Sequence, residues 1–492
     1  MRIGLLPLGR PTFDVPYAER KLGAMLARLE STGHELLGPR TLLTGAEDAA
    51  RALETLRAAR PELVLVLQVT FTDAAFVVRA AAELQTRLAL WAPREPRVGG
   101  RLRLNAFCGL NLASHALGTS GYGFSWLYAD PELELPAAEA PTDAPAPSAD
   151  RVLSSDAAGV DLDAGDPRVA SARDLEALLS GERAVSPLDG APSGAEPLPA
   201  SPLAGARIVR IGAPPEGFDT CRHDTSDVAR RFDARVEEIA LAELFELAGD
   251  APPASVAALR ARAAGELEGL DELDQPELER SLRLKLALEA LRERRDADAF
   301  AIRCWPEAFT EYGGAVCGPV SMMGEARTPC ACEADVWGAL TQLALQRVTD
   351  APVFLVDLVD LDVADDTAVV WHCGQAPLSM AAGDARATLH TNRRMPLLYE
   401  FPLRAGRVTF LRLSQARGAP RVVVATGEVL DRPGAFTGTS GVVRFDAPAD
   451  TVLERVMDSA LEHHTALVYG DHADALKRLA ASLALSLIEL TA

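Results

Sequence analysis

The chain has 492 residues, 48% of them apolar, which is enough for two to four domains with large cores. Asp and Glu number 70 against 49 Lys and Arg, giving a net charge of −21. Because nucleic acids and anionic membranes are bound through clustered basic residues, this balance argues against both kinds of partner. No apolar run reaches the ~18 residues of a transmembrane helix. Seven cysteines, an odd and sparse number, indicate reduced thiols and a cytoplasmic protein.

Residues 1–129 alternate between strand-like and helical patterns. Arg2–Leu8 and Leu63–Leu67 are short apolar runs, as expected for strands that are buried on both faces. Tyr17–Leu29 and Thr72–Leu84 have helical spacing. This alternation predicts an α/β domain with a parallel sheet covered on both sides.

Residues 130–205 have a different composition. The stretch 131–205 contains 11 of the 33 prolines, 14 acidic residues against 4 basic ones, and no aromatic residue. Such a segment buries too little apolar surface to offset the entropy lost on ordering. We predict a disordered insertion, with one short helix near Arg173–Leu179.

The α/β pattern resumes over residues 206–350, which predict a second α/β domain. Its expected strands are Arg207–Ile211 and Ala299–Arg303, and Glu333–Arg347 is helical. Residues 351–492 instead contain short, closely spaced β-rich runs, which predict an antiparallel sheet or barrel followed by a terminal helix. The predicted fold class is therefore α/β, with two N-terminal domains containing parallel sheets and a C-terminal β-rich, barrel-like domain.

Two places combine carboxylates with the end of a predicted strand. Glu307 follows Ala299–Arg303 after a proline, where ligands of open α/β sheets usually bind, although it could be an ordinary early-helix glutamate. Glu333 and Asp335 lie at the start of the next helix, where Glu333 could simply be a helix cap.

A third place contains the neighbouring histidines His463 and His464. In an extended strand successive side chains point to opposite faces, so at most one of the two would face a given centre. Carboxylate and imidazole donors suit a divalent ion such as Mn²⁺. Glu307, Asp335 and His464 are distant in sequence, however, and only the fold could bring them together.

A thiolate zinc site is an alternative, because Cys304, Cys317, Cys330 and Cys332 lie close together in sequence. Zinc sites usually use pairs spaced C-x₂₋₄-C, and here the one close pair has a single-residue gap. This spacing does not favour zinc.

Several stretches together resemble the L-fucose isomerase and L-arabinose isomerase superfamily, on the fucose isomerase side. These stretches are Gly9–Asp14, Arg97–Asn105, Pro214–Asp219, Pro306–Phe309, Cys332–Asp335, Trp371–Gly374, His463–His464 and Tyr469–Gly470. The resemblance spans residues 1–129 and 206–492, nearly everything except the acidic segment. It implies the same arrangement of two α/β domains and a β-rich domain.

The resemblance also implies the activity, a Mn²⁺-dependent aldose–ketose isomerisation of a fucose- or arabinose-like sugar. Carried over by motif, Glu307, Asp335 and His464 are the expected metal ligands, with His463 as the second choice. Arg10 is similar to an N-terminal arginine that reaches the substrate, often in a neighbouring subunit. A homo-oligomer is therefore expected.

An aldose and its ketose share a cis-enediol intermediate, so the expected chemistry is proton transfer between C2 and C1. Glu307 and Asp335 would serve as the base and acid, and Trp371 could stack on the sugar or belong to the core. The alternative function is a non-catalytic sugar-binding or regulatory protein with the same fold.

Overall fold

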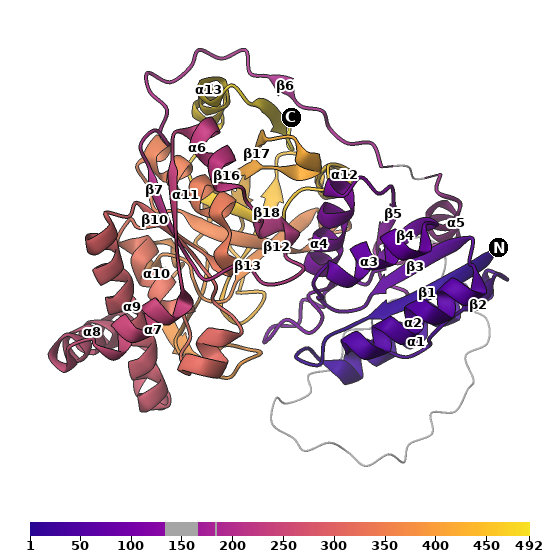
Figure 1. Ribbon diagram of the computed structural model, residues 1–492, viewed down its shortest axis with the longest axis horizontal. Helices are drawn as coiled ribbons and strands as arrows, with labels where there is room; N and C mark the ends of the chain where they lie inside the picture. The colour runs from indigo at the N-terminus through magenta and orange to yellow at the C-terminus, as the bar shows by residue number, and fades with distance from the viewer. Residues whose placement is uncertain (133–165, 183–184) are drawn as a thin grey trace.

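The computed structural model describes residues 1–132, 166–182 and 185–492. Two parallel sheets with helices on their faces and one large mixed sheet organise this part of the chain (Figure 1). The predicted fold class is confirmed. Among the described helices, none is both long and apolar enough to cross a lipid bilayer.

The N-terminal sheet is parallel, with the strand order β2-β1-β3-β4-β5. Its strands are β1 Arg2–Leu8, β2 Glu35–Leu37, β3 Leu63–Gln68, β4 Arg87–Ala92 and β5 Ser125–Tyr128. They alternate with helices α1 Val15–Ser31, α2 Ala46–Ala59, α3 Ala75–Leu84 and α4 Ala106–Thr119. Because the strand order reverses between β1 and β3, the carboxyl ends of these two strands border a crevice where ligands of such sheets usually bind.

The middle sheet is also parallel, with the order β11-β10-β7-β8. Its strands are β7 Arg207–Ile211, β8 Arg235–Ile239, β10 Ala299–Ile302 and β11 Cys330–Ala331. The helices of this region are α6 Thr225–Phe232, α7 Leu241–Gly249, α8 Pro253–Glu266, α9 Gln275–Arg295, α10 Cys317–Glu325 and α11 Val336–Thr349. Helix α11 packs between this sheet and the barrel described next, because Trp337, Leu340 and Leu343 share one buried cluster with residues of both.

Six strands of the large sheet close an antiparallel barrel, in the order β17-β16-β19-β12-β13-β18. Closure results from the pairing of β18 with β17 as well as with β13. These strands are β12 Phe354–Asp362, β13 Thr367–His372, β16 Gly406–Ser414, β17 Arg421–Val429, β18 Thr439–Phe445 and β19 His464–Tyr469. Helices α12 Ala449–Asp458 and α13 Ala473–Leu483 complete the region.

Short strands extend the barrel on two sides. Strands β20 Ser486–Glu489 and β6 Ala191–Pro192 continue from β17, whereas β15 Leu398–Pro402, β14 Ala385–Thr388 and β9 Leu267–Glu268 continue from β18. Two of them, β6 and β9, come from outside residues 351–492. The sheet therefore includes pieces of chain from the predicted insertion and from the middle region.

The prediction of disorder over residues 130–205 is wrong for the described residues 166–182 and 185–205. Helix α5 Ala172–Ser180 is present where a short helix was expected, with a Ser171–Asp174 capping box. Its leucines Leu175, Leu178 and Leu179 are buried, because they lie on one face of the helix. Residues 133–165 and 183–184, to which the same prediction applied, lie outside the described residues.

A buried ionic network joins the N-terminal sheet to the barrel. The Asp360 side chain, on β12, is completely buried and accepts hydrogen bonds from Arg94 Nη2 (2.8 Å), Arg97 Nε (2.6 Å) and Tyr128 Oη (2.7 Å). The pairing of β12 with β13 shifts register between Leu358 and Asp360, which marks a bulge at this point. The network thus ties the bulged strand to the ends of β4 and β5.

Replacing this carboxylate should destabilise the fold. In Asp360→Asn Arg97 loses its nearest carboxylate and the buried Arg94 keeps only Asp362, so we expect a loss of about 3 kcal/mol in the free energy of unfolding, measured by urea denaturation. The control is Asp350→Asn, whose exposed pair with Arg327 should change stability by at most about 1 kcal/mol. Equal effects of the two substitutions would contradict the importance of burial.

The same network predicts a dependence on acid. Burial raises the pKa of the Asp360 carboxyl, but the charges of Arg94 and Arg97 outweigh this effect and leave the pKa below its usual value. A carboxyl with a lowered folded-state pKa stabilises the fold above its unfolded pKa of about 3.9, and this stabilisation is lost as the pH falls further. Between about pH 5 and pH 3 the wild type should lose more stability than Asp360→Asn.

Candidate active site

Three barrel strands place His464, Asp357 and Trp371 in one row. Asp357 on β12 lies opposite His464 on β19 and opposite Trp371 on β13. Residues directly opposite each other in antiparallel strands point to the same face, so the three side chains are neighbours. Asp357 is 7% exposed, in a strand that is otherwise mostly apolar, which is unusual for a carboxylate.

Glu333 brings a second carboxylate to this row from the carboxyl end of the middle sheet. It follows β11 in the short turn η4 Cys332–Ala334, and both Glu333 (φ 60°) and Ala334 (φ 57°) have left-handed backbone conformations. Such conformations cost about 1–3 kcal/mol each in residues other than glycine and are concentrated at functional sites. Trp305 Nε1 (3.2 Å) and His463 Nε2 (3.0 Å) donate hydrogen bonds to its two oxygens.

Both histidines face the Glu333 carboxylate. His464 Nε2 lies 3.8 Å from the oxygen that His463 Nε2 contacts, and the two rings are stacked with centroids 3.9 Å apart. The expectation that at most one histidine faces the centre fails here, because β19 begins at His464 and His463 precedes the extended segment. His464 Nε2 is also 3.6 Å from Asp357 Oδ1.

Asp335 orients the His464 ring from behind. Its carboxylate accepts hydrogen bonds from His464 Nδ1 (3.0 Å) and Arg412 Nη1 (2.7 Å), and from the amide of Gly338 (2.8 Å) as the N-cap of α11. A side chain at position 338 would collide with this carboxylate, since a Cβ there would lie 2.6 Å from Asp335 Oδ2. With Nδ1 engaged, the other ring nitrogen of His464 is directed toward Glu333 and Asp357.

The charges of the cluster favour ionised carboxylates. Burial raises the pKa of Glu333, but the hydrogen bond and charge of His463 outweigh it and lower the pKa to about 2. For Asp335 the charge of Arg412 and the contact with His464 likewise outweigh burial and lower the pKa. Burial and the neighbouring His463 lower the pKa of His464, so its imidazole is neutral and able to act as a ligand.

The three ligands expected from the sequence do not form one group. Asp335 and His464 are in contact, but Glu307 is held by Arg303, which donates two hydrogen bonds of 2.6 Å to its carboxylate. Among the described residues, no contact joins Glu307 to Asp335 or His464. The reason is local, because Glu307 starts the short helix η3 Ala308–Tyr312 and Arg303, four residues earlier and just after β10, neutralises it.

The structure instead groups other donors. Asp357, His463 and His464 each offer a ligand atom within 4.8 Å of the others, and His464 forms a similar group with Glu333 and Cys221. Asp357 Oδ1 is buried and has no hydrogen-bond partner. An unpaired buried carboxylate oxygen is costly, so this donor set fits a divalent cation with a preference for oxygen and imidazole ligands, such as Mn²⁺.

The four cysteines of the zinc alternative separate into different contacts. Cys304 and Cys332 have their sulfur atoms 2.7 Å apart, Cys317 lies near Cys373 and His390, and the Cys330 thiol donates to the Thr328 carbonyl. The close sequence positions of the four thiols therefore do not produce a single four-thiolate centre.

A pocket of about 110 Å³ opens onto Glu333, Asp357 and His463. The N-terminal sheet contributes Arg10, Phe13, Phe71 and Asn105 to its wall, and the middle region contributes Trp305 and Phe309. Trp371 also lines the pocket, although its ring is only 6% exposed and its Nε1 donates to the Thr437 carbonyl. Arg10 and Trp371, the two substrate contacts expected from the sequence, thus both border this pocket.

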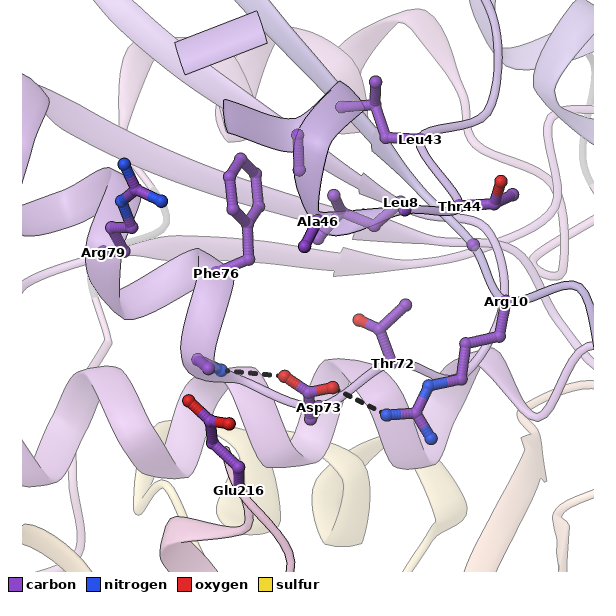
Figure 2. A pocket seen from close by; sticks show the side chains of 14 residues that line it. Leu8, Arg10, Leu43, Thr44, Ala46, Thr72, Asp73, Phe76, Arg79 and Glu216 are labelled. Atoms are coloured by element: carbon purple, nitrogen blue, oxygen red, sulfur yellow. Dashed lines mark hydrogen bonds and ion pairs between the residues drawn. The ribbon is translucent and has the colours of Figure 1, made fainter. Parts of the chain in front are cut away.

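Arg10 also borders a second, larger pocket of about 460 Å³ at the carboxyl ends of β1 and β3. Figure 2 shows Arg10 with its guanidinium turned toward Asp73, and Nη2 lies 2.6 Å from the carboxylate. The expectation that this arginine serves a neighbouring subunit is not needed for the smaller pocket, because the same chain supplies Arg10 to it.

Comparisons with known proteins identify relatives of this chain. Residues 4–139 match the N-terminal domain of fucose/sulfoquinovose isomerases, and residues 370–491 match the C-terminal domain of L-fucose isomerases. Sulfoquinovose isomerase of Alkalicoccus urumqiensis is 28% identical over 491 residues, covering 99% of both chains. Those of Clostridium sp. (strain MSTE9) and Priestia aryabhattai are 28% and 27% identical, covering 98% and 95% of this chain and 98% and 94% of their own.

Two matched substitutions distinguish the expected from the observed carboxylate. Glu333→Gln removes a charge beside His463, His464 and Asp357, so it should weaken Mn²⁺ binding by at least about tenfold in a calorimetric titration. Glu307→Gln should leave the affinity unchanged, because its partner is Arg303. Weaker binding in Glu307→Gln than in Glu333→Gln would restore the prediction made from the sequence.

Proposed function

The chain belongs to the fucose isomerase-like superfamily and is a sugar aldose–ketose isomerase, and from this premise we propose that it converts sulfoquinovose to the corresponding ketose with the help of a bound Mn²⁺. The observation that carries the proposal is that Glu333 and Asp357 border one pocket and that His464 Nε2 lies within 4 Å of both carboxylates. The full-length similarity to sulfoquinovose isomerases supports this substrate over a fucose- or arabinose-like sugar. The family assignment favours an enzyme over a non-catalytic sugar-binding protein.

We assign the metal to Glu333, Asp357 and His464, in place of the set containing Glu307 and Asp335. The unpaired Asp357 oxygen and the oriented Nε2 of His464 support this assignment. Asp335 becomes the carboxylate that fixes the tautomer and ring orientation of His464, a common arrangement behind metal-binding histidines. When bound, a divalent ion would polarise the sugar oxygens and stabilise negative charge as it develops on them.

The two carboxylates of the pocket supply the proton transfer. Isomerisation requires that the proton on C2 of the aldose is removed and that a proton is delivered to C1, through an enediol. Glu333 and Asp357 both border the pocket, and Glu333 is kept ionised by His463, as a general base must be. His463 also fixes the position of the Glu333 carboxylate together with Trp305.

Aromatic walls hold the sugar and keep water away from the reacting carbons. Phe13, Phe71 and Phe309 border the pocket and are less than 10% exposed. Trp305 and Trp371 offer indole surfaces on which the C–H face of a sugar can pack. Exclusion of water by these rings would strengthen the attraction between a bound divalent ion and the negative charge that develops on the sugar oxygens.

A homo-oligomer remains a prediction. It was expected because related isomerases build their pockets across subunits, whereas here Arg10 reaches the pocket of its own chain. Light scattering measures the state directly.

Isomerisation in D₂O tests the proposed function. Sulfoquinovose incubated with the protein and Mn²⁺ should give a ketose that carries deuterium at C1, because the transferred proton exchanges with solvent on the carboxylate. Removal of metal by EDTA should abolish turnover, and Mn²⁺ should restore it. Conversion that continues unchanged after removal of the metal would contradict the role of the ion, and no conversion of sulfoquinovose would contradict the substrate.

The catalytic roles are tested by two substitutions. Glu333→Gln and Asp357→Asn should each lower kcat by at least about 10²-fold, the size of a general acid–base contribution. Glu307→Gln is the matched control and should keep kcat within about twofold, because it lies on Arg303 rather than in the pocket. Retention of wild-type kcat in a folded Asp357→Asn variant would remove Asp357 from the mechanism.

A further inference from the structure

Two guanidinium groups lie near the Trp305 ring in the wall of the catalytic pocket. The Arg10 guanidinium carbon is 5.2 Å from the ring centroid, and that of Arg393 is 5.8 Å away. Arg10 follows β1 of the N-terminal sheet, whereas Arg393 lies in the loop between β14 and β15. Two separate parts of the chain therefore direct positive charge to the same aromatic surface.

The charges of the two arginines are compensated differently. Arg10 has a carboxylate partner in Asp73, at 2.6 Å. Within the described residues, Arg393 forms no ion pair with a carboxylate, although it is half-buried. Burial and the nearby Arg10 lower the pKa of its guanidinium. A second cation beside the same ring, without a carboxylate partner, is a cost that an anionic ligand would remove.

Trp305 connects this pair of arginines to the reacting end of the pocket. Its Nε1 donates to Glu333, while its ring faces Arg10 and Arg393. His390, whose Nδ1 accepts hydrogen bonds of 3.3 Å from the amides of Asn392 and Arg393, fixes the turn that presents Arg393. One indole thus has a carboxylate at its nitrogen and two cations near its ring.

We propose that Arg393, assisted by Arg10, binds a tetrahedral anion on the sugar, a sulfonate or a phosphate, at the end of the substrate remote from the reacting carbonyl. Arg393 is then the residue that selects an anionic aldose over a neutral one. This inference rests on the proposed function, since it assumes that Glu333 and Asp357 act at C1 and C2. Guanidinium groups suit such anions because their planar N–H donors match pairs of oxygens.

A charged substrate tail explains the arrangement better than a neutral one. A neutral hydroxyl would leave Arg393 without a counter-charge beside Arg10, whereas a sulfonate carries a full negative charge at neutral pH and offers three acceptor oxygens. Asp73 already occupies Arg10 Nη2, whereas no carboxylate of the described residues occupies Arg393, and both arginines border the same pocket.

Steady-state kinetics of Arg393→Gln test the inference with four sugars: sulfoquinovose, glucose 6-phosphate, glucose and L-fucose. KM for the anionic substrate should rise at least about tenfold, the usual value of a hydrogen bond to a charged group, with kcat within about twofold. KM for neutral sugars should be unchanged. The ratio of the two anionic KM values in the wild type identifies sulfonate or phosphate as the preferred group.

Matched variants and a binding assay keep the result interpretable. Arg394→Gln changes the adjacent exposed arginine and should behave as the wild type, whereas Arg393→Lys should recover part of the affinity. Calorimetry with methanesulfonate should show binding to the wild type that Arg393→Gln loses. If the wild type converts no aldose but Arg393-dependent methanesulfonate binding persists, the proposed function fails and the anion site stands. Equal KM changes for anionic and neutral sugars, or unchanged methanesulfonate binding, overturn the anion site.

Discussion

The contact between Asp335 and His464 joins the parts of the protein on which the candidate site depends. Asp335 caps helix α11 of the middle region, and His464 begins the barrel strand β19. Arg412, on the barrel strand β16, neutralises the buried Asp335 carboxylate and holds it in place. Without this ionic contact, the His464 ring would have no fixed orientation toward Glu333 and Asp357. One buried carboxylate therefore serves helix stability, sheet-to-barrel packing and the geometry of the site at the same time.

Much of the fold could be predicted because its signals are local. The unbroken apolar run of β3 predicted a parallel sheet buried on both faces. The short strands after residue 350 predicted an antiparallel sheet. The acidic segment was the main error. Its average composition indicated disorder, but Leu175, Leu178 and Leu179 lie on one helix face and are buried. Composition averages over a segment, whereas burial depends on where its few leucines lie.

The candidate site was harder to predict because it depends on which carboxylates are already paired with an arginine. Glu307 and Glu333 both follow strands of the middle sheet, but Arg303 occupies the first of them. Arg303 lies only four residues before Glu307, just after β10, and is therefore close enough in sequence to pair with it. Asp357 also had a signal, since a carboxylate in the apolar run Phe354–Asp362 needs a reason to be buried. Arg393 had none, because its position beside Trp305 depends entirely on the path of a loop.

The central position of β19 in the barrel has a consequence for the biosynthesis of the protein. This strand pairs with β12 and β16, yet it follows both of them in the chain. Until the ribosome has released it, the edges of β12 and β16 that it will cover have no partner, and the carboxylates at 333 and 357 have no histidine. Such unpaired edges invite association with other chains. The nascent protein therefore passes through a state in which β12 and β16 exist with open edges, and protection of those edges until β19 pairs with them would limit aggregation.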